Sequence, residues 1–357
     1  MNRLLIVLWL SCLLLSCQKQ ASETQKGAEQ AVIDENKEVV CFVYHRFGDD
    51  RYPSTNTSTS DFEAHLNYLK TNGFQVITLS QAIDYLKSDQ SPKKTAVITV
   101  DDGFKSFYEN GLPLLTKYDL TATLFINTKT VGSSDYMNWN EIKESSKSGI
   151  EIGNHTHSHS YFLNLPENDR YTQFKNEINL SQQLIEEHTG IVPETFAYPY
   201  GELDPQMKTI AKEMGFKAAA AQNSGVIYGA SDLYQLPRFP MSESYASINQ
   251  FVSKANMKAL KIENKNPESF VLADGESTPS LRLTFKGDSL ILDQLQCFIQ
   301  GSECDKTLMK NGDITEVTLT ASTPINSRRR TLYTITVPDK HGNWHWFSHL
   351  WINPKLQ

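Results

Sequence analysis

The chain has 357 residues, of which 39% are hydrophobic and 21% are charged, so it is long enough for one large domain with a packed core and one smaller domain. It carries a net charge of -7 at pH 7. This acidic balance excludes nucleic acid as the main partner, because a phosphate-binding surface needs an excess of basic side chains. The arginine run at residues 328–330 is more typical of a solvated strand end than of a binding patch.

An export signal is predicted at residues 1–17. It combines a basic residue near the start, an apolar stretch that is too short to span a bilayer, and a small residue before Cys17. The letters LLSC at residues 14–17 resemble a bacterial lipobox, which implies a lipid anchor on Cys17; Gln18 after it favours an outer-membrane lipoprotein facing the periplasm. Leu15 stands where a smaller residue is usual, so a secreted or cell-surface protein is the alternative. Residues 18–37 are polar and are expected to form a flexible tether.

Strand and helix signals alternate along residues 38–262. We expect strands at residues 39–44, 74–78, 95–100, 122–127, 150–153, 195–198, 218–221 and 236–239. We expect helices at residues 61–70, from a cap at Ser80, at 104–118 with a break near Gly111, at 139–148, at 171–189, after Asp204 as N-cap with Pro205 as the first helical residue, and at 247–255. This alternation predicts an α/β fold with a parallel sheet covered by helices.

The composition changes after residue 260. Residues 264–267, NKNP, are expected to be a linker, and the short alternating runs that follow predict a small all-β sandwich at residues 267–357. Cys297 and Cys304 lie close together in an exported chain and are expected to form a disulfide, whereas Cys41 sits in an apolar run as a buried free thiol. The aromatic residues at 344–351 are interpreted as one apolar face of a strand, with a sugar-stacking platform as the alternative.

Chemistry is concentrated after two of the predicted strands. The strand at residues 95–100 runs into Asp101 and Asp102, two adjacent carboxylates that repel each other unless a cation or a proton separates them. A turn in which they cap the next helix is the alternative. Farther along, HTHSH at residues 155–159 places three imidazoles at alternate positions. Two imidazoles and one carboxylate form the ligand set of a catalytic divalent metal that keeps an open position.

Three motifs resemble, in the same order, those of the polysaccharide deacetylase family, the NodB-homology carbohydrate esterases. They are TVDDG at residues 99–103, HTHSH at 155–159 and AYPYG at 197–201, and the resemblance extends over residues 41–260. It implies an irregular (β/α) barrel at residues 38–262 and the use of one divalent metal, zinc first, with cobalt or nickel as alternatives. In such barrels the catalytic residues lie at the carboxyl ends of strands, which is also where the predicted elements place the candidate residues His45, Asp101, Asp102, His155, His159, Tyr200 and Arg238.

The resemblance also assigns roles to these positions. Asp102, His155 and His159 would be the metal ligands, and His157 would be a neighbour of the site. Asp101 would be the general base that takes the proton from the metal-bound water. The backbone N–H of Tyr200 would donate to the oxyanion of the tetrahedral intermediate.

Two positions depart from the family pattern. Many relatives carry an arginine in the third motif that steadies the base; this chain has none there, and Arg238 in LPRFP at residues 236–240 is the candidate substitute. Many relatives also have a late histidine that acts as general acid. This chain has an early YH instead, which resembles the branch that deacetylates poly-β-1,6-N-acetylglucosamine and makes His45 the candidate acid. His65 and His188 lie on predicted helices and are expected at the surface.

The sequence therefore predicts a metal-dependent N-deacetylase that acts on an extracytoplasmic polysaccharide of the poly-N-acetylglucosamine type. Within the same class, the site could remove O-acetyl groups or act on chitin or peptidoglycan. In a different class, the chain could be a catalytically silent carbohydrate-binding lipoprotein. The complete set of acidic and imidazole residues weighs against silence, because a binding protein needs no base beside a metal.

Overall fold

The computed structural model describes residues 36–356. Its first part is a parallel sheet with the strand order β1 (Glu38–Tyr44), β5 (Thr95–Val100), β6 (Thr123–Ile126), β7 (Glu151–Asn154), β8 (Thr195–Ala197) and β9 (Ala218–Ala220). Shorter strands extend it, namely β4 (Gln75–Val76) beside β5, and β10 (Val226–Tyr228) and β11 (Phe239–Pro240) beside β1. All six residues of β5 are buried, as expected for a β-branched strand covered on both faces.

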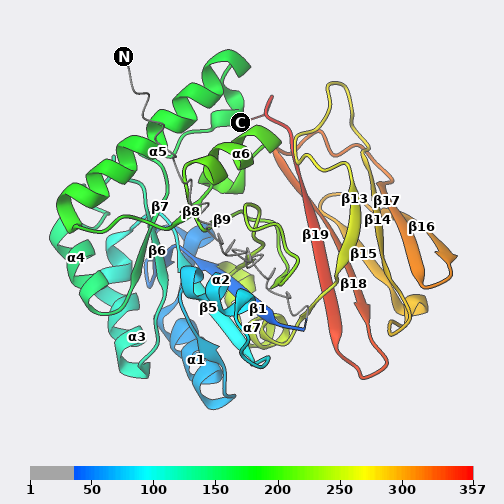
Figure 1. The fold of residues 1–357 in the computed structure, drawn as a ribbon, viewed down its shortest axis with the longest axis horizontal. Coiled ribbons are helices and arrows are strands. Elements are labelled where there is room, and N and C mark those ends of the chain that lie inside the picture. Colours follow the sequence, from blue (N-terminus) through cyan, green and yellow to red (C-terminus); the bar gives the residue numbers. More distant parts are fainter. Residues whose placement is uncertain (1–35, 357) are drawn as a thin grey trace, which may run out of the picture. The chain divides into compact units, whose positions relative to one another are not determined.

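The two ends of this sheet are connected by residues 236–240. Leu236 forms a bridge with Ala220 of β9, and Phe239 pairs with Phe42 of β1. The sheet therefore curls into the irregular (β/α) barrel that the resemblance implied (Figure 1). The segment predicted as a strand at residues 236–239 is the piece that brings the sheet ends together.

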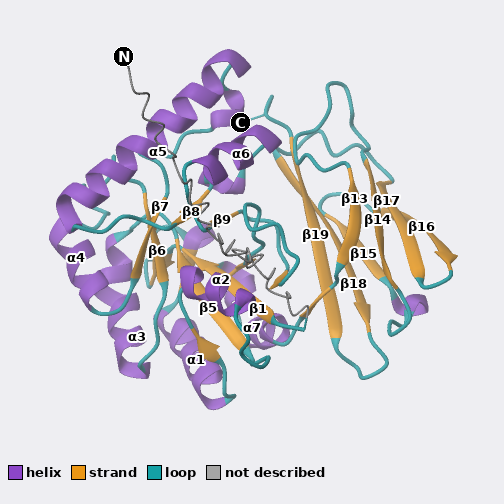
Figure 2. Cartoon of the chain, viewed as in Figure 1, coloured by secondary structure: helices purple, strands orange, loops and turns teal. Residues whose placement is uncertain are grey.

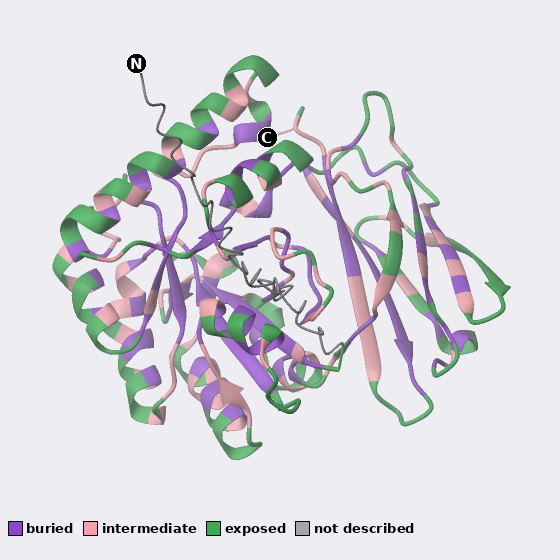
Figure 3. Cartoon of the chain, viewed as in Figure 1, coloured by how far each residue is buried: buried purple, intermediate pink, exposed green. Residues whose placement is uncertain are grey.

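Helices cover the outer face of the barrel sheet (Figure 2). They are α1 (Thr59–Thr71), α2 (Leu79–Lys87), α3 (Leu112–Tyr118), α4 (Trp139–Lys147), α5 (Glu167–Thr189), α6 (Pro205–Glu213) and α7 (Ile248–Ala255). A π-helical turn at Phe107–Gly111 precedes α3, which agrees with the expected break near Gly111. Each helix turns apolar residues inward and polar residues outward, so the strands are buried and the outer helix faces are exposed (Figure 3). Among the described helices, none has the length and apolar character that crossing a membrane requires.

One helix start was predicted correctly and one was wrong. Asp204 caps α6, because its carboxylate accepts from the Met207 amide at 2.9 Å. The cap of α2 is Thr78 and not Ser80. The Thr78 hydroxyl accepts from the backbone of Gln81, whose side chain accepts in return from the Thr78 amide, so the reciprocal capping box fixes the start two residues earlier.

The rest of the chain forms two four-stranded sheets that pack as a sandwich. One has the order β12 (Lys258–Ala259), β19 (Trp344–Ile352), β18 (Arg330–Pro338) and β15 (Gln296–Ile299), and the other has the order β13 (Ile262–Asn266), β14 (Ser280–Lys286), β17 (Ile314–Ala321) and β16 (Cys304–Asn311). Alternate residues of β14 and β17 are buried, which is the period-2 pattern that predicted the sandwich. Short elements elsewhere are β2 (Arg46–Phe47), β3 (Asn56–Thr57) and the 3-10 turns Pro53–Thr55, Phe162–Asn164, Pro199–Gly201, Glu243–Ala246 and Leu292–Gln294.

Residues 264–266 of the expected linker belong to a strand, and only Pro267 lies outside it. Ile262–Asn266 forms β13 and pairs with β14 along its length. Its side chains are mostly polar and exposed or half-buried, so the sequence lacks the alternation of apolar residues that would have indicated a strand. The Cys297–Cys304 disulfide is confirmed and joins β15 to β16, and Cys41 is confirmed as a buried free thiol. Trp351 is buried in the sandwich core, the packing role that the sequence favoured.

The predicted signal, Cys17 and nearly all of the predicted tether lie outside the described residues. The last tether position, Lys37, is described and is 1% exposed. Its ammonium group donates to the Tyr85 carbonyl at 3.2 Å, so the ordered part of the chain includes at least this end of the expected tether.

Candidate active site

A buried ion pair lies at the carboxyl end of β5. Asp101 is 0% exposed, and its backbone N–H donates to the Tyr44 carbonyl of β1 at 2.9 Å. Arg238, also 0% exposed, holds both carboxylate oxygens, with Nη1 2.7 Å from Oδ1 and Nη2 2.8 Å from Oδ2. The sequence therefore placed Arg238 correctly beside Asp101, although 137 residues separate them.

The guanidinium of Arg238 also forms hydrogen bonds outside the ion pair. Nε donates to the Ala221 carbonyl at 2.9 Å, and Nη1 also lies 3.0 Å from the Thr99 hydroxyl. Burial alone would raise the pKa of Asp101, but the charge of Arg238, with smaller contributions from His155 and His45, holds that pKa well below its ordinary value. Asp101 is therefore an ionised carboxylate at neutral pH.

The three residues expected to bind a metal converge next to this pair. Asp102, His155 and His159 each offer one ligand atom, and these atoms all lie within 4.8 Å of one another. Oδ1 of Asp102 is 3.6 Å from Nε2 of His155 and 3.4 Å from Nε2 of His159. The geometry therefore brings together one carboxylate and two imidazoles, a donor set that suits zinc and similar divalent ions.

The protonation of His155 fits a ligand. Its Nδ1 lies 2.7 Å from the Ala197 carbonyl oxygen, which can only accept, so Nδ1 carries the hydrogen and Nε2 presents its lone pair to Asp102 and His159. Burial, together with the neighbouring His159, lowers the pKa of His155 to about 4. Burial likewise lowers the pKa of His159 to about 4. Both rings are therefore neutral at pH 7, the form that binds metal.

The backbone around this cluster adopts left-handed conformations that non-glycine residues seldom occupy. Positive φ values occur at Asp102 (74°), Thr156 (66°), His159 (54°) and Tyr200 (58°). Such conformations cost on the order of 1–3 kcal/mol each and concentrate at functional sites. They aim the side chains of Asp102 and His159 at one point, and they turn the chain sharply at Tyr200.

The remaining four histidines of the barrel divide into one near the site and three with other surroundings. His45 follows the last residue of β1, Tyr44, which pairs with Val100 directly before Asp101. His157 is not one of the three clustered ligands, and its Nδ1 lies 2.9 Å from the Thr128 hydroxyl. His188 is exposed as expected and stacks on Trp139.

The expectation for His65 was wrong, because this histidine is 0% exposed on the inner face of α1. Nε2 donates to the Ala246 carbonyl at 2.7 Å, Nδ1 lies 3.0 Å from the Tyr44 hydroxyl, and the ring stacks on Phe251 at 4.0 Å. The helical position alone did not reveal that both ring nitrogens would find partners in the core. His65 thus supports β1 directly before His45.

The interpretation of the arginine run at residues 328–330 as a solvated strand end was also wrong. Arg329 is 8% exposed and forms two 2.7 Å contacts with the buried carboxylate of Glu202. Arg330, the first residue of β18, donates to the Tyr200 carbonyl at 2.8 Å. Two adjacent arginines of the sandwich therefore hold the loop that carries the third motif, a link that no local signal in the sequence predicts.

Aromatic rings complete this side of the site. Tyr200 stacks on Tyr161 with 3.7 Å between ring centroids and lies edge-on to His159 at 4.4 Å. Arg329 lies over the other ring of this stack, 4.2 Å from the centroid of Tyr161. Tyr161 was not among the predicted site residues, and its position two residues after His159 is the one signal that could have indicated it.

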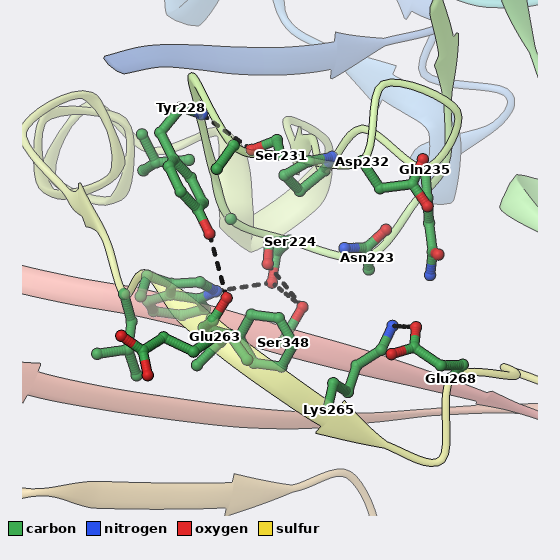
Figure 4. A pocket seen from close by; sticks show the side chains of 18 of the residues that line it. Asn223, Ser224, Tyr228, Ser231, Asp232, Gln235, Glu263, Lys265, Glu268 and Ser348 are labelled. Carbon is green, nitrogen blue, oxygen red and sulfur yellow. Dashed lines mark hydrogen bonds and ion pairs between the residues drawn. The ribbon is translucent and has the colours of Figure 1, made fainter. Parts of the chain in front are cut away.

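Two cavities lie between the barrel and the sandwich, and Trp346 lines both. The first, of about 270 Å³, contains the side chains of Asp232, Glu263, Glu268 and Lys265 (Figure 4). The second, of about 240 Å³, includes Arg330 and so adjoins the third-motif loop. Asp102, His155 and His159 line neither of these two cavities, so their cluster is separate from both.

Comparisons with known proteins agree with this arrangement. The family described as polysaccharide deacetylase matches residues 88–219. The chain is 28% identical over 215 residues to the poly-beta-1,6-N-acetyl-D-glucosamine N-deacetylase of Staphylococcus aureus, an alignment that covers 57% of this chain and 73% of the relative. IcaB from Ammonifex degensii superimposes with a TM-score of 0.55 at 27% identity, covering 61% of this chain and 97% of that structure.

A further solved structure, the deacetylase PplD of Streptococcus pyogenes in complex with acetate, has a TM-score of 0.56 at 20% identity, with 61% of this chain and 98% of that structure covered. At that identity the likeness concerns the fold alone. The matched family segment contains Asp101, Asp102, His155 and His159, the residues that the fold brings together. The chain therefore contains a polysaccharide deacetylase domain and is a hydrolase that acts on amide bonds.

Proposed function

We propose that this hydrolase is a metal-dependent N-deacetylase that removes acetyl groups from N-acetylglucosamine units of an exopolysaccharide of the poly-β-1,6-linked type. The observation that carries the proposal is the buried Asp101–Arg238 pair beside the convergent side chains of Asp102, His155 and His159, whose donor atoms suit a metal. The polymer is inferred from similarity to a poly-beta-1,6-N-acetyl-D-glucosamine N-deacetylase and from the position of His45 directly after the first strand.

The residues present fit a divalent metal by the chemistry of their donors. Asp102, His155 and His159 would hold it, zinc first, with cobalt or nickel as alternatives. When bound, such an ion supplies Lewis acidity toward a carbonyl and lowers the pKa of water toward ~7. Three protein ligands also leave a position open for water or substrate.

Each remaining residue has a task in amide hydrolysis. Asp101, kept ionised by Arg238, accepts a proton from the attacking water as its oxygen bonds to the acetyl carbon. The Tyr200 backbone N–H stabilises the negative charge that develops on the carbonyl oxygen. His45 donates a proton to the sugar nitrogen as the C–N bond breaks. Acetate and a free amino sugar are the products.

Acetate release from a panel of polymers would test this proposal. We expect release from β-1,6-linked poly-N-acetylglucosamine, with loss of activity after chelation and recovery after addition of zinc. Faster release from chitin, peptidoglycan or an O-acetylated xylan would assign the enzyme to another substrate. Binding of glycan without release from any polymer, in metal-loaded protein, would favour a catalytically silent carbohydrate-binding lipoprotein.

We also propose that the enzyme is exported and anchored by lipid at Cys17, facing the periplasm from the outer membrane. The support is the signal and lipobox sequence alone, because Cys17 lies outside the described residues. Mass spectrometry of the mature N-terminus would test the anchor. An unmodified terminus that begins at another residue would indicate ordinary secretion.

A further inference from the structure

The second interdomain cavity, which we call the rim groove, is built by both parts of the chain. The barrel contributes Gln222, Tyr245 and Lys254, and the sandwich contributes Gln300, Arg330 and Trp346. The volume of about 240 Å³ is close to the lower end of small-molecule sites. The groove can therefore hold a single sugar ring.

The rim groove adjoins the third-motif loop of the active site. Arg330 lines the groove and donates to the carbonyl of Tyr200, the residue proposed to stabilise the oxyanion. Gln222 also lines it and packs against Gly201, where an added Cβ would lie 2.4 Å from the Gln222 Cβ. A polymer whose reacting sugar lies beside Tyr200 can therefore place a neighbouring sugar in the groove.

The chemistry of the lining suits a sugar. Tyr245 is 49% exposed and offers an aromatic face to the C–H groups of a ring, while the amides of Gln222 and Gln300 can donate to and accept from hydroxyl and acetamido groups. Trp346 adds a second aromatic ring, over which the Lys254 ammonium lies at 3.9 Å.

The charged side chains that line the rim groove are all cationic. Lys254 and Arg330 are cations, and no aspartate or glutamate occurs among the described residues that line it. The cavity in Figure 4 differs, since its lining includes three carboxylates and a single lysine. Like charges placed together across a binding surface oppose binding, so the rim groove disfavours a cationic ligand.

We infer that the rim groove binds the sugar next to the reacting residue and accepts N-acetylglucosamine there in preference to glucosamine. This inference rests on the proposed function. An N-acetylated neighbour is uncharged, whereas a deacetylated neighbour carries a protonated amine in weakly acidic solution and meets two cations. The enzyme would then deacetylate residues that are separated from one another along the polymer.

The test compares a large and a small substrate. Tyr245→Ala should lower kcat/KM for a β-1,6-linked pentamer of N-acetylglucosamine about tenfold, a factor that corresponds to about 1.4 kcal/mol. The same variant should leave hydrolysis of 4-nitrophenyl acetate unchanged, because that ester is too small to reach the groove. Met309→Ala is the matched control, since Met309 is 61% exposed on β16 and does not line the groove; it should behave as wild type on both substrates.

Product mapping and binding give independent readouts. Mass spectrometry of wild-type products at pH 6 should find glucosamine residues separated by N-acetylglucosamine, and Lys254→Gln should increase the share of adjacent pairs. Calorimetry with Asp101→Asn, which should bind without turnover, should give weaker pentamer binding when Tyr245→Ala is added.

The outcomes separate the two proposals. A wild-type enzyme that does not deacetylate the pentamer would overturn the proposed function, and the groove inference with it. An active wild type with equal defects of Tyr245→Ala on both substrates, or with no defect at all, would overturn the groove inference alone. Adjacent glucosamine pairs at equal frequency in wild type and Lys254→Gln would overturn the preference for an acetylated neighbour.

Discussion

The Arg329–Glu202 pair gives the sharpest prediction, because it joins the sandwich to the third-motif loop. Glu202→Gln keeps the shape of the side chain and removes its charge, which leaves Arg329 buried without its anionic partner. The two side chains are 7% and 3% exposed, so the pair is a buried salt bridge. Breaking a buried pair from one side costs roughly 3–5 kcal/mol. The corresponding fall in Tm is on the order of 5–10 °C.

Thermal unfolding, followed by circular dichroism, would measure this loss. The control is Glu194→Gln, which breaks an exposed contact with Lys217 at 2.9 Å, with side chains 54% and 37% exposed. Exposed pairs of this kind contribute about 0–1 kcal/mol, so the control should melt close to wild type.

Activity of the same variant tests whether the pair also positions the site. Because Glu202 lies two residues after Tyr200, loosening the loop should lower kcat at a temperature where the protein is still folded, while KM changes little. A double variant that also carries Arg329→Met should recover part of the stability, since no buried charge is then unpaired. Equal stability of Glu202→Gln and wild type would refute the reasoning about the buried pair. A loss of stability with an unchanged kcat would refute the claim that the pair positions the active site.

Four further outcomes are expected. His159→Ala should purify with less bound zinc than wild type by elemental analysis, and equal metal content would remove it from the ligand set. Asp101→Asn should keep its metal but lose about 100–10,000-fold in acetate release, the usual share of a general base; near-normal release would exclude that role. His45→Ala should slow amide cleavage far more than cleavage of an activated ester, whose leaving group needs no proton, and equal defects with a lower Tm would indicate packing. Burial lowers the pKa of His65 from 6.5 to about 4, so the unfolded chain takes up the proton first, and about 3 kcal/mol of stability is lost as pH falls through this range. His65→Gln should lack this loss when the free energy of unfolding is measured by urea titration at pH 7 and pH 4. The same difference in unfolding free energy between the two pH values in the variant and the wild type would contradict the prediction.

Features that depend on neighbours in the sequence were predictable. The strand Thr95–Val100 has the expected bounds, because an unbroken β-branched run ends at two carboxylates. Asp204 caps α6 for the same kind of local reason, as a short acceptor directly before a proline. The cluster of Asp102, His155 and His159 could also be predicted from the sequence, since parallel strands end at one edge of the sheet and bring Asp102 and His155 together.

Features that depend on distant partners were not predictable in this way. A histidine on a helix has the same local sequence whether it faces solvent or, like His65, finds Tyr44 and Ala246 in the core. The polar strand β13 is defined by its hydrogen bonds to β14 and not by an apolar face. In both cases the tertiary contact decides the structure, and local propensity carries little of the information.

The orientation of the arginines at residues 329 and 330 also depends on a distant partner, and it affects the active site. A strand end normally exposes its charged side chains, and only the approach of the third-motif loop turns these two inward. Arg329 supplies a charge for Glu202, and Arg330 supplies a donor for a carbonyl in a loop held at positive φ at Tyr200. A strained conformation persists only when its surroundings over-determine it. Because the barrel and the sandwich both determine this loop, the sandwich is part of the machinery that shapes the active site.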